Sequence, residues 1–383
     1  MITTKKVLIL SGTRADFGKI KSIILSIQEH KKLELEVFVT GMHLDRKYGY
    51  TIDEIYKSNI KNIVPFDNSS ISKKMEVVFS ETIKGLSNHI QKFKPDLIVV
   101  HGDRIEALAA AIVGSLNNIL VAHIEGGEVS GTIDESIRHA ITKFSHLHFV
   151  TDVKARKRLT QLGEIKESIY VIGSPDIDLM DPSNLSPLVE VKERYEIGFK
   201  KYAIALFHPV ITEIEQLEIQ INSFCDALIE SQLDYIVVFP NNDNGSDTIL
   251  NAYNKKLVSK RFKIFPSIRF EYFLTLLKDA SFIIGNSSSG IREAPYYNVP
   301  TIDIGTRQKN RVNLESVITT KYDKKSILQS INKALELDPS AYQIQETLFG
   351  NGDSHEQFLN ALEDEILWKT NNQKLFQDIN FDE

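Results

Sequence analysis

The stretch VLILSGTRADFGK, residues 7–19, contains the pattern that decides the fold. It begins with a short apolar run, residues 7–10, which is typical of a buried β-strand. A polar loop with a glycine follows over residues 11–16, and the pattern after it predicts a helix over residues 17–29. A strand, a polar loop and a helix in this order make up the repeating unit of a parallel α/β sheet.

The same unit recurs along the whole chain. In the first half we predict further strands at residues 35–39, 97–100, 119–123, 148–150 and 169–172, and helices at 105–116, 134–144 and 154–162. Residues 181–187, rich in Asp, Ser, Asn and Pro, indicate a linker. Beyond it we predict strands at 202–207, 235–239, 262–265, 282–284 and 301–304, and helices at 213–230, 247–258, 272–280 and 291–297. We expect two Rossmann-like, doubly wound α/β domains facing a cleft, over residues 1–174 and 175–360.

Length and composition limit the function classes. A chain of 383 residues with 42% hydrophobic and 25% charged residues suits two globular domains. Its net charge of −6 and pI of about 6.0 give no sign of a nucleic-acid partner. The single cysteine, Cys225, excludes an intramolecular disulfide and a CxxC zinc motif. The first apolar run is too short for a signal peptide or a membrane span, so we expect a cytoplasmic protein without membrane attachment.

The segment GNSSSG, residues 285–290, is a candidate phosphate site. A strand is expected to end there, glycine permits close approach of a ligand to the backbone, and Ser287 and Ser288 precede a predicted helix with free N–H groups. The alternative is ordinary helix capping by one of these residues. Glu293 follows one turn later, where its carboxylate could accept bonds from ribose hydroxyls. Neither a GxxxxGK[ST] nor a GxGxxG motif is present, which argues against ATP hydrolysis and NAD binding.

Three carboxylates, Asp103, Glu125 and Asp134, lie at strand ends or at a helix start in the first half. Removing a carbon-bound proton requires one group that accepts it and another that protonates a leaving oxygen. For each residue taken alone, a role as a cap or a salt-bridge partner is favoured. Three of them on neighbouring strand ends favour acid–base chemistry.

Histidines and arginines accompany these carboxylates. His101, His123 and His139 suggest a metal site, but their spacing matches no common ligand motif, and histidines near strand ends often bond main-chain carbonyls. We expect no metal. His208 ends a predicted strand and faces the expected cleft, although a structural role is possible. Arg14, Arg104 and Arg307 follow strands in polar loops, where they could bind phosphate or simply face solvent.

Taken together, these segments resemble the hydrolysing UDP-N-acetylglucosamine 2-epimerases of sialic acid biosynthesis. The matching stretches occur in the family's order: SGTRADFGK (11–19), VTGMHL (39–44), HGDRIEALA (101–109), HIEGGEVSGTIDESIRH (123–139), IGSPDID (172–178), FHPV (207–210), FPSIRFEYF (265–273), GNSSSGIREAP (285–295) and GTRQKNR (305–311). The resemblance implies a fold of the glycosyltransferase-B type in which the C-terminal helix, within residues 361–383, packs back on the first domain. It also implies a reaction without a cofactor and a homodimer or homotetramer.

The resemblance carries roles to individual positions. Asp103, Glu125 and Asp134 match catalytic carboxylates, and His208 matches a functional histidine that also contacts the nucleotide. Arg104 matches a substrate-site arginine, and Ile268 matches a main-chain contact to the nucleoside. The other matches are nucleotide contacts: Arg14, Asn241, Ser287, Ser288, Glu293 and Arg307.

The implied reaction converts UDP-N-acetylglucosamine and water to N-acetylmannosamine and UDP through 2-acetamidoglucal. Non-hydrolysing relatives have Gln where this chain has Met42, and a Glu-Glu-containing stretch in place of residues 134–138. Both departures favour the hydrolysing branch. A close alternative substrate is the nucleotide-linked 2,4-diacetamido-2,4,6-trideoxyhexose of legionaminic acid synthesis. Alternatives from other classes are a metal-dependent hydrolase, a glycosyltransferase and a non-catalytic nucleotide-binding protein.

Overall fold

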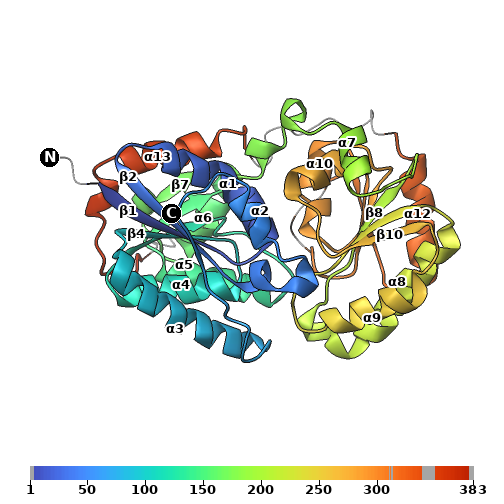
Figure 1. Cartoon of the computed structure of the whole chain (residues 1–383), viewed down its shortest axis with the longest axis horizontal. Coiled ribbons are helices and arrows are strands. Elements are labelled where there is room, and N and C mark those ends of the chain that lie inside the picture. Colours follow the sequence, from blue (N-terminus) through green and yellow to red (C-terminus); the bar gives the residue numbers. More distant parts are fainter. Residues whose placement is uncertain (1–3, 310, 312–313, 339–349, 379–383) are drawn as a thin grey trace.

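The computed structural model describes residues 4–309, 311, 314–338 and 350–378. Figure 1 shows two α/β units side by side, each built on a twisted sheet. All the strand pairs are parallel, as expected from the alternation of strands and helices. The expected fold of two Rossmann-like α/β domains is therefore confirmed.

The first sheet has seven strands in the order β3-β2-β1-β4-β5-β6-β7. They are β1 (Lys5–Ser11), β2 (Leu33–Val39), β3 (Ile63–Pro65), β4 (Leu97–His101), β5 (Leu120–Ile124), β6 (Leu147–Val150) and β7 (Ile169–Val171). The strand order reverses between β1 and β4, and open α/β sheets bind ligands beyond the carboxyl ends of the strands at such a point. The loops after β1 and β4 therefore flank the natural ligand position of this domain.

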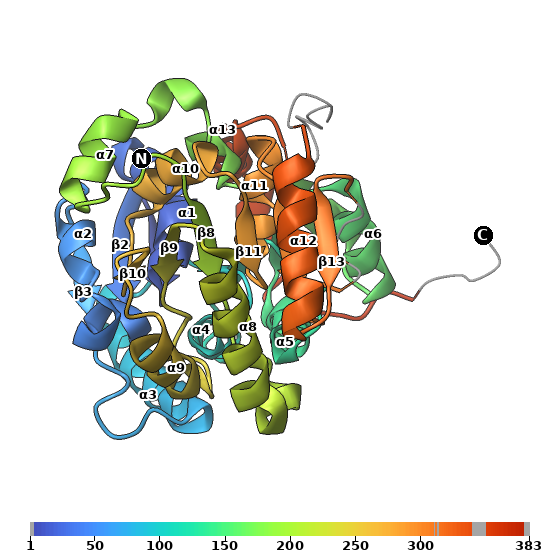
Figure 2. The same cartoon turned by 90° about the vertical axis from the view of Figure 1, so that its right-hand side faces the viewer.

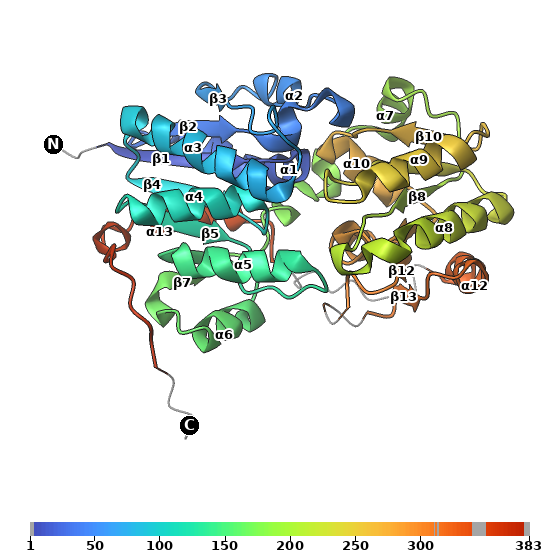
Figure 3. The ribbon, with the colours of Figure 1, turned by 90° about the horizontal axis from the view of Figure 1, so that it is seen from below.

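Alternate residues of β1 pack into cores on opposite faces of the first sheet. Val7 and Ile9 pack with α1, whereas Leu8 and Leu10 pack towards α3 and α4. Figure 3 shows α3, α4 and α5 side by side on one face. The helices of this domain are α1 (Arg14–Glu29), α2 (Ile52–Tyr56), α3 (Met75–Phe93), α4 (Ile105–Leu116), α5 (Ile133–Phe144) and α6 (Val153–Gln161).

The second sheet has six strands in the order β10-β9-β8-β11-β12-β13, with its reversal between β8 and β11. The strands are β8 (Ala203–Leu206), β9 (Tyr235–Val238), β10 (Phe262–Phe265), β11 (Ile283–Gly285), β12 (Thr301–Ile304) and β13 (Val317–Thr320). The helices are α7 (Leu188–Arg194), α8 (Leu217–Ser231), α9 (Ser246–Lys256), α10 (Phe270–Lys278), α11 (Glu293–Tyr296) and α12 (Lys324–Glu336). Figure 2 shows α8 and α9 on one side of this sheet.

The C-terminal helix α13 (Ser354–Glu363) lies against α1, on the first domain (Figure 1). The ring of Phe358 is fully buried, and its centroid lies 4.3 Å from that of Phe149. The helix therefore begins before residue 361, the start that we expected from the resemblance. The reason is that its buried apolar positions, Phe358, Ala361 and Leu362, have the spacing of one helix face and end before Asp364.

Most predicted helices differ from the structure by one to three residues at an end, and two differ in kind over part of their length. The helix expected at 213–230 begins at Leu217, because Glu213 has non-helical angles (φ −117°, ψ 17°) within the 3-10 segment Ile211–Gln216. The helix expected at 291–297 is the four-residue α11, preceded by the 3-10 turn Ser288–Gly290. The sequence analysis also missed strands β3 and β13, which are partly exposed edge strands with weak apolar patterns.

Within the described ranges, no helix has both the length and the apolar character needed to cross a bilayer.

Candidate active site

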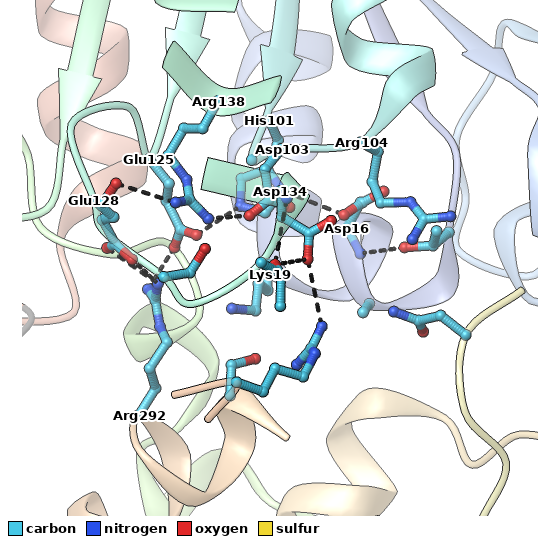
Figure 4. Close-up of a pocket in the computed structure, with 18 of the residues that line it drawn as sticks. Asp16, Lys19, His101, Asp103, Arg104, Glu125, Glu128, Asp134, Arg138 and Arg292 are labelled. Atoms are coloured by element: carbon cyan, nitrogen blue, oxygen red, sulfur yellow. Dashed lines mark hydrogen bonds and ion pairs between the residues drawn. The ribbon is translucent and has the colours of Figure 1, made fainter. Parts of the chain in front are cut away.

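Two adjoining cavities lie where the carboxyl ends of both sheets meet. We define the charged cavity by its lining residues, several of which Figure 4 labels: Thr13, Ala15, Asp16, Lys19, His101, Gly102, Asp103, Arg104, Glu125, Glu128, Ser130, Thr132, Asp134, Arg138, Asn241, Ser288, Arg292, Arg307, Gln308 and Arg311. We define the apolar-walled cavity likewise: Arg14, Ala15, Lys19, Leu206, His208, Val238, Phe239, Asn241, Ile268, Phe270, Phe273, Ser287, Ser288, Ser289, Glu293 and Arg307. They share Ala15, Lys19, Asn241, Ser288 and Arg307.

Every site residue predicted from the sequence lines one of these cavities. Asp103, Arg104, Glu125 and Asp134 line the charged cavity. The apolar-walled cavity receives Arg14, His208, Ile268, Ser287 and Glu293. Carboxylates of the first domain thus share a cavity with Ser288 of the second, which is the arrangement that the hypothesis requires.

Glu125 follows β5 and is held in place by several neighbours. Its Oε1 accepts hydrogen bonds from Arg292 at 2.5 Å and from Ser174 at 2.5 Å, and its Oε2 lies 3.3 Å from His101 Nε2. Burial alone would raise the pKa of Glu125, but Arg292, Lys19 and His101 together hold it well below its usual value. The backbone of Glu125 has φ 63°, a left-handed conformation that costs a non-glycine residue energy and is often found at functional sites.

His101 ends β4 and lies between two carboxylates. Its Nδ1 is 3.6 Å from Asp16 Oδ1, on the side opposite Glu125. Burial lowers the pKa of His101, but Glu125 and Asp16 outweigh this effect and raise it to about 9. His101 therefore carries a positive charge at neutral pH. The bond to a main-chain carbonyl expected for such a histidine is instead made by His123, whose Nε2 lies 2.7 Å from the Gly102 oxygen.

Asp103 and Asp134 lie near each other but differ in their contacts. Asp103 accepts a hydrogen bond from Arg138 of α5. Asp134, in the first turn of α5, accepts a bond from Thr132 Oγ1 at 2.8 Å and lies 3.6 Å from Arg307. Burial, and then the charge of Asp103, raise the pKa of Asp134, although Arg307 opposes the shift. Asp134 thus takes up a proton more readily than Glu125, whose pKa is lowered.

The apolar-walled cavity combines a hydrophobic surface with polar ends. Leu206, Val238, Phe270 and Phe273 supply the wall, and Glu293 supplies a buried carboxylate. Such a combination suits an organic ring carrying polar groups. Burial raises the pKa of Glu293, whereas Lys19, 3.9 Å away, opposes this.

The serine-rich segment forms a turn rather than the start of a long helix. Ser287 Oγ accepts a bond from the Ser289 N–H at 3.3 Å, so one serine does act as a cap, and the helix beyond is only α11. Gly285 has φ 141°, and a Cβ there would come 1.7 Å from the Leu206 oxygen. Only glycine fits at this position, which brings Ser287 and Ser288 to the cavities.

His208 follows β8 and is held as a neutral imidazole. Its main chain exchanges two hydrogen bonds with the Asn286 side chain, at 2.7 and 2.8 Å. The Asn241 N–H donates to His208 Nδ1 at 3.4 Å, which places the ring proton on Nε2. Burial and Arg307 lower the pKa of His208 to about 3. The imidazole therefore offers a neutral N–H donor to the cavity.

The three predicted arginines each bridge to the other part of the site. Arg14 of α1 donates to Ser267, and burial lowers its pKa to about 10. Arg104 donates to Asp243 at 2.6 Å and to Asn242 at 2.7 Å, so its guanidinium is bound to the second domain. Arg307 of the second domain lies 3.6 Å from Asp134 of the first, and it also donates to the Asn286 oxygen at 3.2 Å. Ile268 lines the apolar-walled cavity, and its side chain is buried in the core of the second domain.

The sequence analysis missed six charged residues of the charged cavity: Asp16, Lys19, Glu128, Arg138, Arg292 and Arg311. Lys19 lies 3.2 Å from Asp176, and Arg292 bonds both oxygens of Glu128 at 3.2 Å. One signal was present, because Lys19 shares a helix face with the apolar Ile23 and Ile27, where a solvated lysine is unexpected. Arg292 had no such signal, since its partners are more than 100 residues away.

The histidines near these carboxylates had suggested a metal site as an alternative. Among the described residues, no three His, Cys, Asp or Glu side chains come together as a metal site requires. His101 and Glu125 instead form an ion pair.

A family model and several known proteins are similar to this chain over most of its length. A family model described as UDP-N-acetylglucosamine 2-epimerase matches residues 25–363. A UDP-N-acetylglucosamine 2-epimerase of Neisseria meningitidis serogroup B is 45% identical over 379 residues, covering 98% of this chain and all of that protein. The Legionella pneumophila UDP-N,N'-diacetylbacillosamine 2-epimerase (hydrolyzing) is 33% identical over 359 residues, covering 92% and 94%.

Solved structures share the fold. The UDP-GlcNAc 2-epimerase of Methanocaldococcus jannaschii, in complex with UDP-GlcNAc and UDP, superposes with a TM-score of 0.79 at 22% identity, covering 93% of this chain and 99% of that one. The matched family model spans most of the chain, and both relatives match over nearly their full length. The chain therefore belongs to the UDP-N-acetylglucosamine 2-epimerase family.

Proposed function

We propose that this protein is a hydrolysing UDP-N-acetylglucosamine 2-epimerase that releases N-acetylmannosamine and UDP. The observation that carries the proposal is the junction of the two cavities. Acid–base carboxylates line one, an apolar wall with polar ends lines the other, and Ser288, Asn241 and Arg307 border both. A nucleotide sugar has the same division into a polar sugar, a diphosphate and a flat base.

In the proposed mechanism, a carboxylate of the charged cavity first removes the proton from C2. The C1–O bond breaks at the same time, its electron pair leaves with UDP, and a C1=C2 double bond forms. Water then adds to C1, and C2 receives a proton on the opposite face. The overall reaction consumes one water, cleaves the bond between C1 and UDP, and inverts C2. Asp103, Glu125 and Asp134 carry these proton transfers. Their environments differ, since the pKa of Glu125 is lowered and that of Asp134 is raised.

The C2 proton is only weakly acidic, so the departing diphosphate must be strongly stabilised. Arg307 borders both cavities, and His208, a neutral N–H donor under the influence of the Arg307 charge, lines the apolar-walled cavity. Fixed donors aimed at developing charge are among the largest contributions to catalysis. Glu293 would accept bonds from the ribose hydroxyls in the apolar-walled cavity, and the main chain at Ile268 would contact the base.

The lining of the charged cavity favours N-acetylglucosamine over a 4-acetamido-6-deoxy sugar. Apart from Ala15 and Gly102, the lining residues of this cavity carry polar or charged side chains. A C6 methyl group and a second acetamide methyl would find no apolar partner there, and apolar groups placed against charged walls lose their gain from leaving water. The higher identity to the Neisseria protein than to the Legionella protein points the same way.

The test is incubation with UDP-N-acetylglucosamine in deuterated water, followed by NMR. We expect free N-acetylmannosamine with deuterium at C2, together with UDP. Nucleotide-linked N-acetylmannosamine would contradict the hydrolysing assignment, and faster turnover of the diacetamido donor would contradict the choice of sugar. Undiminished activity after exhaustive chelation is expected, and its loss would favour a metal-dependent hydrolase. Sedimentation would test a homodimer or homotetramer, which the family resemblance supports.

A further inference from the structure

Arg292 is a buried arginine of the second domain whose side chain ends among residues of the first. It precedes α11, and its side chain is only 2% exposed. Its Nη2 donates to Glu125 and to Ser174, and its Nη1 donates to both oxygens of Glu128. Its Nε lies 3.3 Å from Asp176. Figure 4 shows this side chain pointing towards Glu125 and Glu128.

The arrangement fixes one oxygen of a reaction carboxylate from across the cleft. A guanidinium is planar and can donate several bonds at set angles, so it constrains the orientation of the carboxylates around it. The base of the side chain is also fixed, because Ile291 and Ala294 are buried and the Arg292 N–H donates to the Ser288 oxygen at 3.0 Å. Because the backbone of Arg292 is fixed, its guanidinium holds the Glu125 carboxylate in one orientation.

The residue next to Arg292 faces the other cavity. Glu293 lines the apolar-walled cavity, whereas Arg292 lines the charged cavity. A single turn of the second domain therefore touches both the expected nucleoside position and Glu125. A nucleotide bound against Glu293 and Ser287 would hold this turn in place, and with it the contact between Arg292 and Glu125.

We propose that Arg292 is a positioning residue for the epimerisation, which orients Glu125 and keeps it ionised when the second domain closes on the first. This inference rests on the proposed function and adds to it a link between nucleotide seating and the state of a reaction carboxylate. Arg292 acts through Glu125 and is not assigned a contact with substrate.

The charges around Glu125 support the proposal. Its cationic neighbours are Lys19 from α1, His101 from β4, Arg138 from α5 and Arg292, and its anionic neighbours are Glu128 and Asp176. After burial, which raises the pKa of Glu125, Arg292 has the largest effect, and it lowers this pKa. The other three cations belong to the first domain, so Arg292 is the one that depends on domain closure.

The test uses two substitutions at Arg292 and one control. Arg292→Gln removes the charge, and Arg292→Lys keeps a charge but cannot bond Glu125, Glu128 and Asp176 at once. The control is Lys21→Gln, because Lys21 of α1 forms another ion pair across the domains, 2.6 Å from Glu271 of α10, away from Glu125. Purified proteins are compared for kcat, KM, pH profile and affinity for UDP, with thermal unfolding as a check of folding.

We expect Arg292→Gln to lower kcat by about 100-fold, the order found when a reacting group is misplaced, with UDP affinity close to that of the parent. The acidic limb of the pH profile of kcat should move to higher pH in this variant, because Glu125 loses a neighbouring cation and its pKa rises. Arg292→Lys should have a kcat and an acidic limb between those of Arg292→Gln and the parent. Lys21→Gln should have the kcat and the pH profile of the parent.

Three results would overturn the inference: an unchanged pH profile in Arg292→Gln, a rise in KM with kcat unchanged, or an equal loss in Lys21→Gln. If Arg292→Gln does not fold, Arg292→Lys decides, since parental kcat and pH profile there would also overturn it. A parent protein that releases no UDP from UDP-N-acetylglucosamine would instead refute the proposed function, which separates the two failures.

Discussion

The charged cavity and the apolar-walled cavity adjoin each other but are built by opposite means. In the charged cavity, ionised side chains from distant parts of the chain hold one another, as Arg292 holds Glu125 and Glu128. In the apolar-walled cavity, Phe270, Phe273 and neighbouring aliphatic side chains form a surface that belongs to the core of the second domain. In the proposed function, the first cavity performs the chemistry and the second recognises the nucleotide.

This division predicts that substitutions in the charged cavity lower kcat with little effect on UDP affinity. We expect the largest loss for Asp103→Asn, about 10³-fold in kcat, because the amide cannot exchange a proton as the carboxylate does. UDP release assays and calorimetry with UDP would measure the two effects. Glu215→Gln, at an exposed carboxylate of the second domain, serves as the control. Weak UDP binding by Asp103→Asn with normal kcat would contradict this division of roles between the two cavities.

His208 lies in the apolar-walled cavity but is assigned to the leaving diphosphate, so it tests the boundary between the cavities. We expect His208→Ala to lower kcat by about 10²-fold, the usual cost of losing one donor to a developing negative charge. Since the pKa of His208 is about 3, the imidazole stays neutral at all higher pH, and the loss should be equal from pH 6 to pH 9. A loss that grows or shrinks across this range would mean that His208 titrates during the reaction.

Glu293 should show the opposite pattern from Asp103. We expect Glu293→Gln to weaken UDP binding by about 10-fold, roughly the cost of one impaired buried hydrogen bond, with a much smaller change in kcat. Titration with UDP and with uracil alone would locate the effect, because only UDP carries the ribose. Equal weakening for both ligands would mean that Glu293 does not bind the ribose.

Ile268 should give the smallest effect, because the expected contact comes from its main chain. Ile268→Val shortens a buried side chain and should cost about 1 kcal/mol of stability. UDP affinity should change less than about twofold, since the backbone of Ile268 is retained. Thermal unfolding and UDP titration measure the two quantities. A large loss of affinity would show that the side chain shapes the cavity itself.

Local sequence was enough to predict the fold and much of the site. The strands β1, β4 and β5 were predicted within a residue or two, because apolar β-branched runs bounded by glycine and polar residues leave few alternatives. The polar residues just after these strands had to meet at one edge, since parallel strands all end on the same side. Asp103 and Glu125 could therefore be placed near each other before any coordinates.

The short helix α11 was harder to predict, because its length depends on tertiary contacts. The polar and apolar pattern of residues 291–297 fits a longer helix. In the structure the helix ends at Tyr296 and the chain turns towards β12, and the Val299 N–H donates to the Ala294 oxygen at 3.0 Å. The edge strands β3 and β13 were missed because their apolar pattern is weak: no residue of β3 is buried, and in β13 only Ile318 is buried.

The sequence by itself determined the two α/β domains, the edge at which ligands bind and the residue types gathered there, because these follow from local periodicity and parallel strand direction. Only the tertiary structure decided which charges meet: Arg292 with Glu125, His101 with Asp16, and Arg104 with Asp243. The physical reason is that an ion pair depends on distance in space. His101 and Asp16 meet once the first domain folds, whereas the two arginine pairs form only when both domains are folded and face each other.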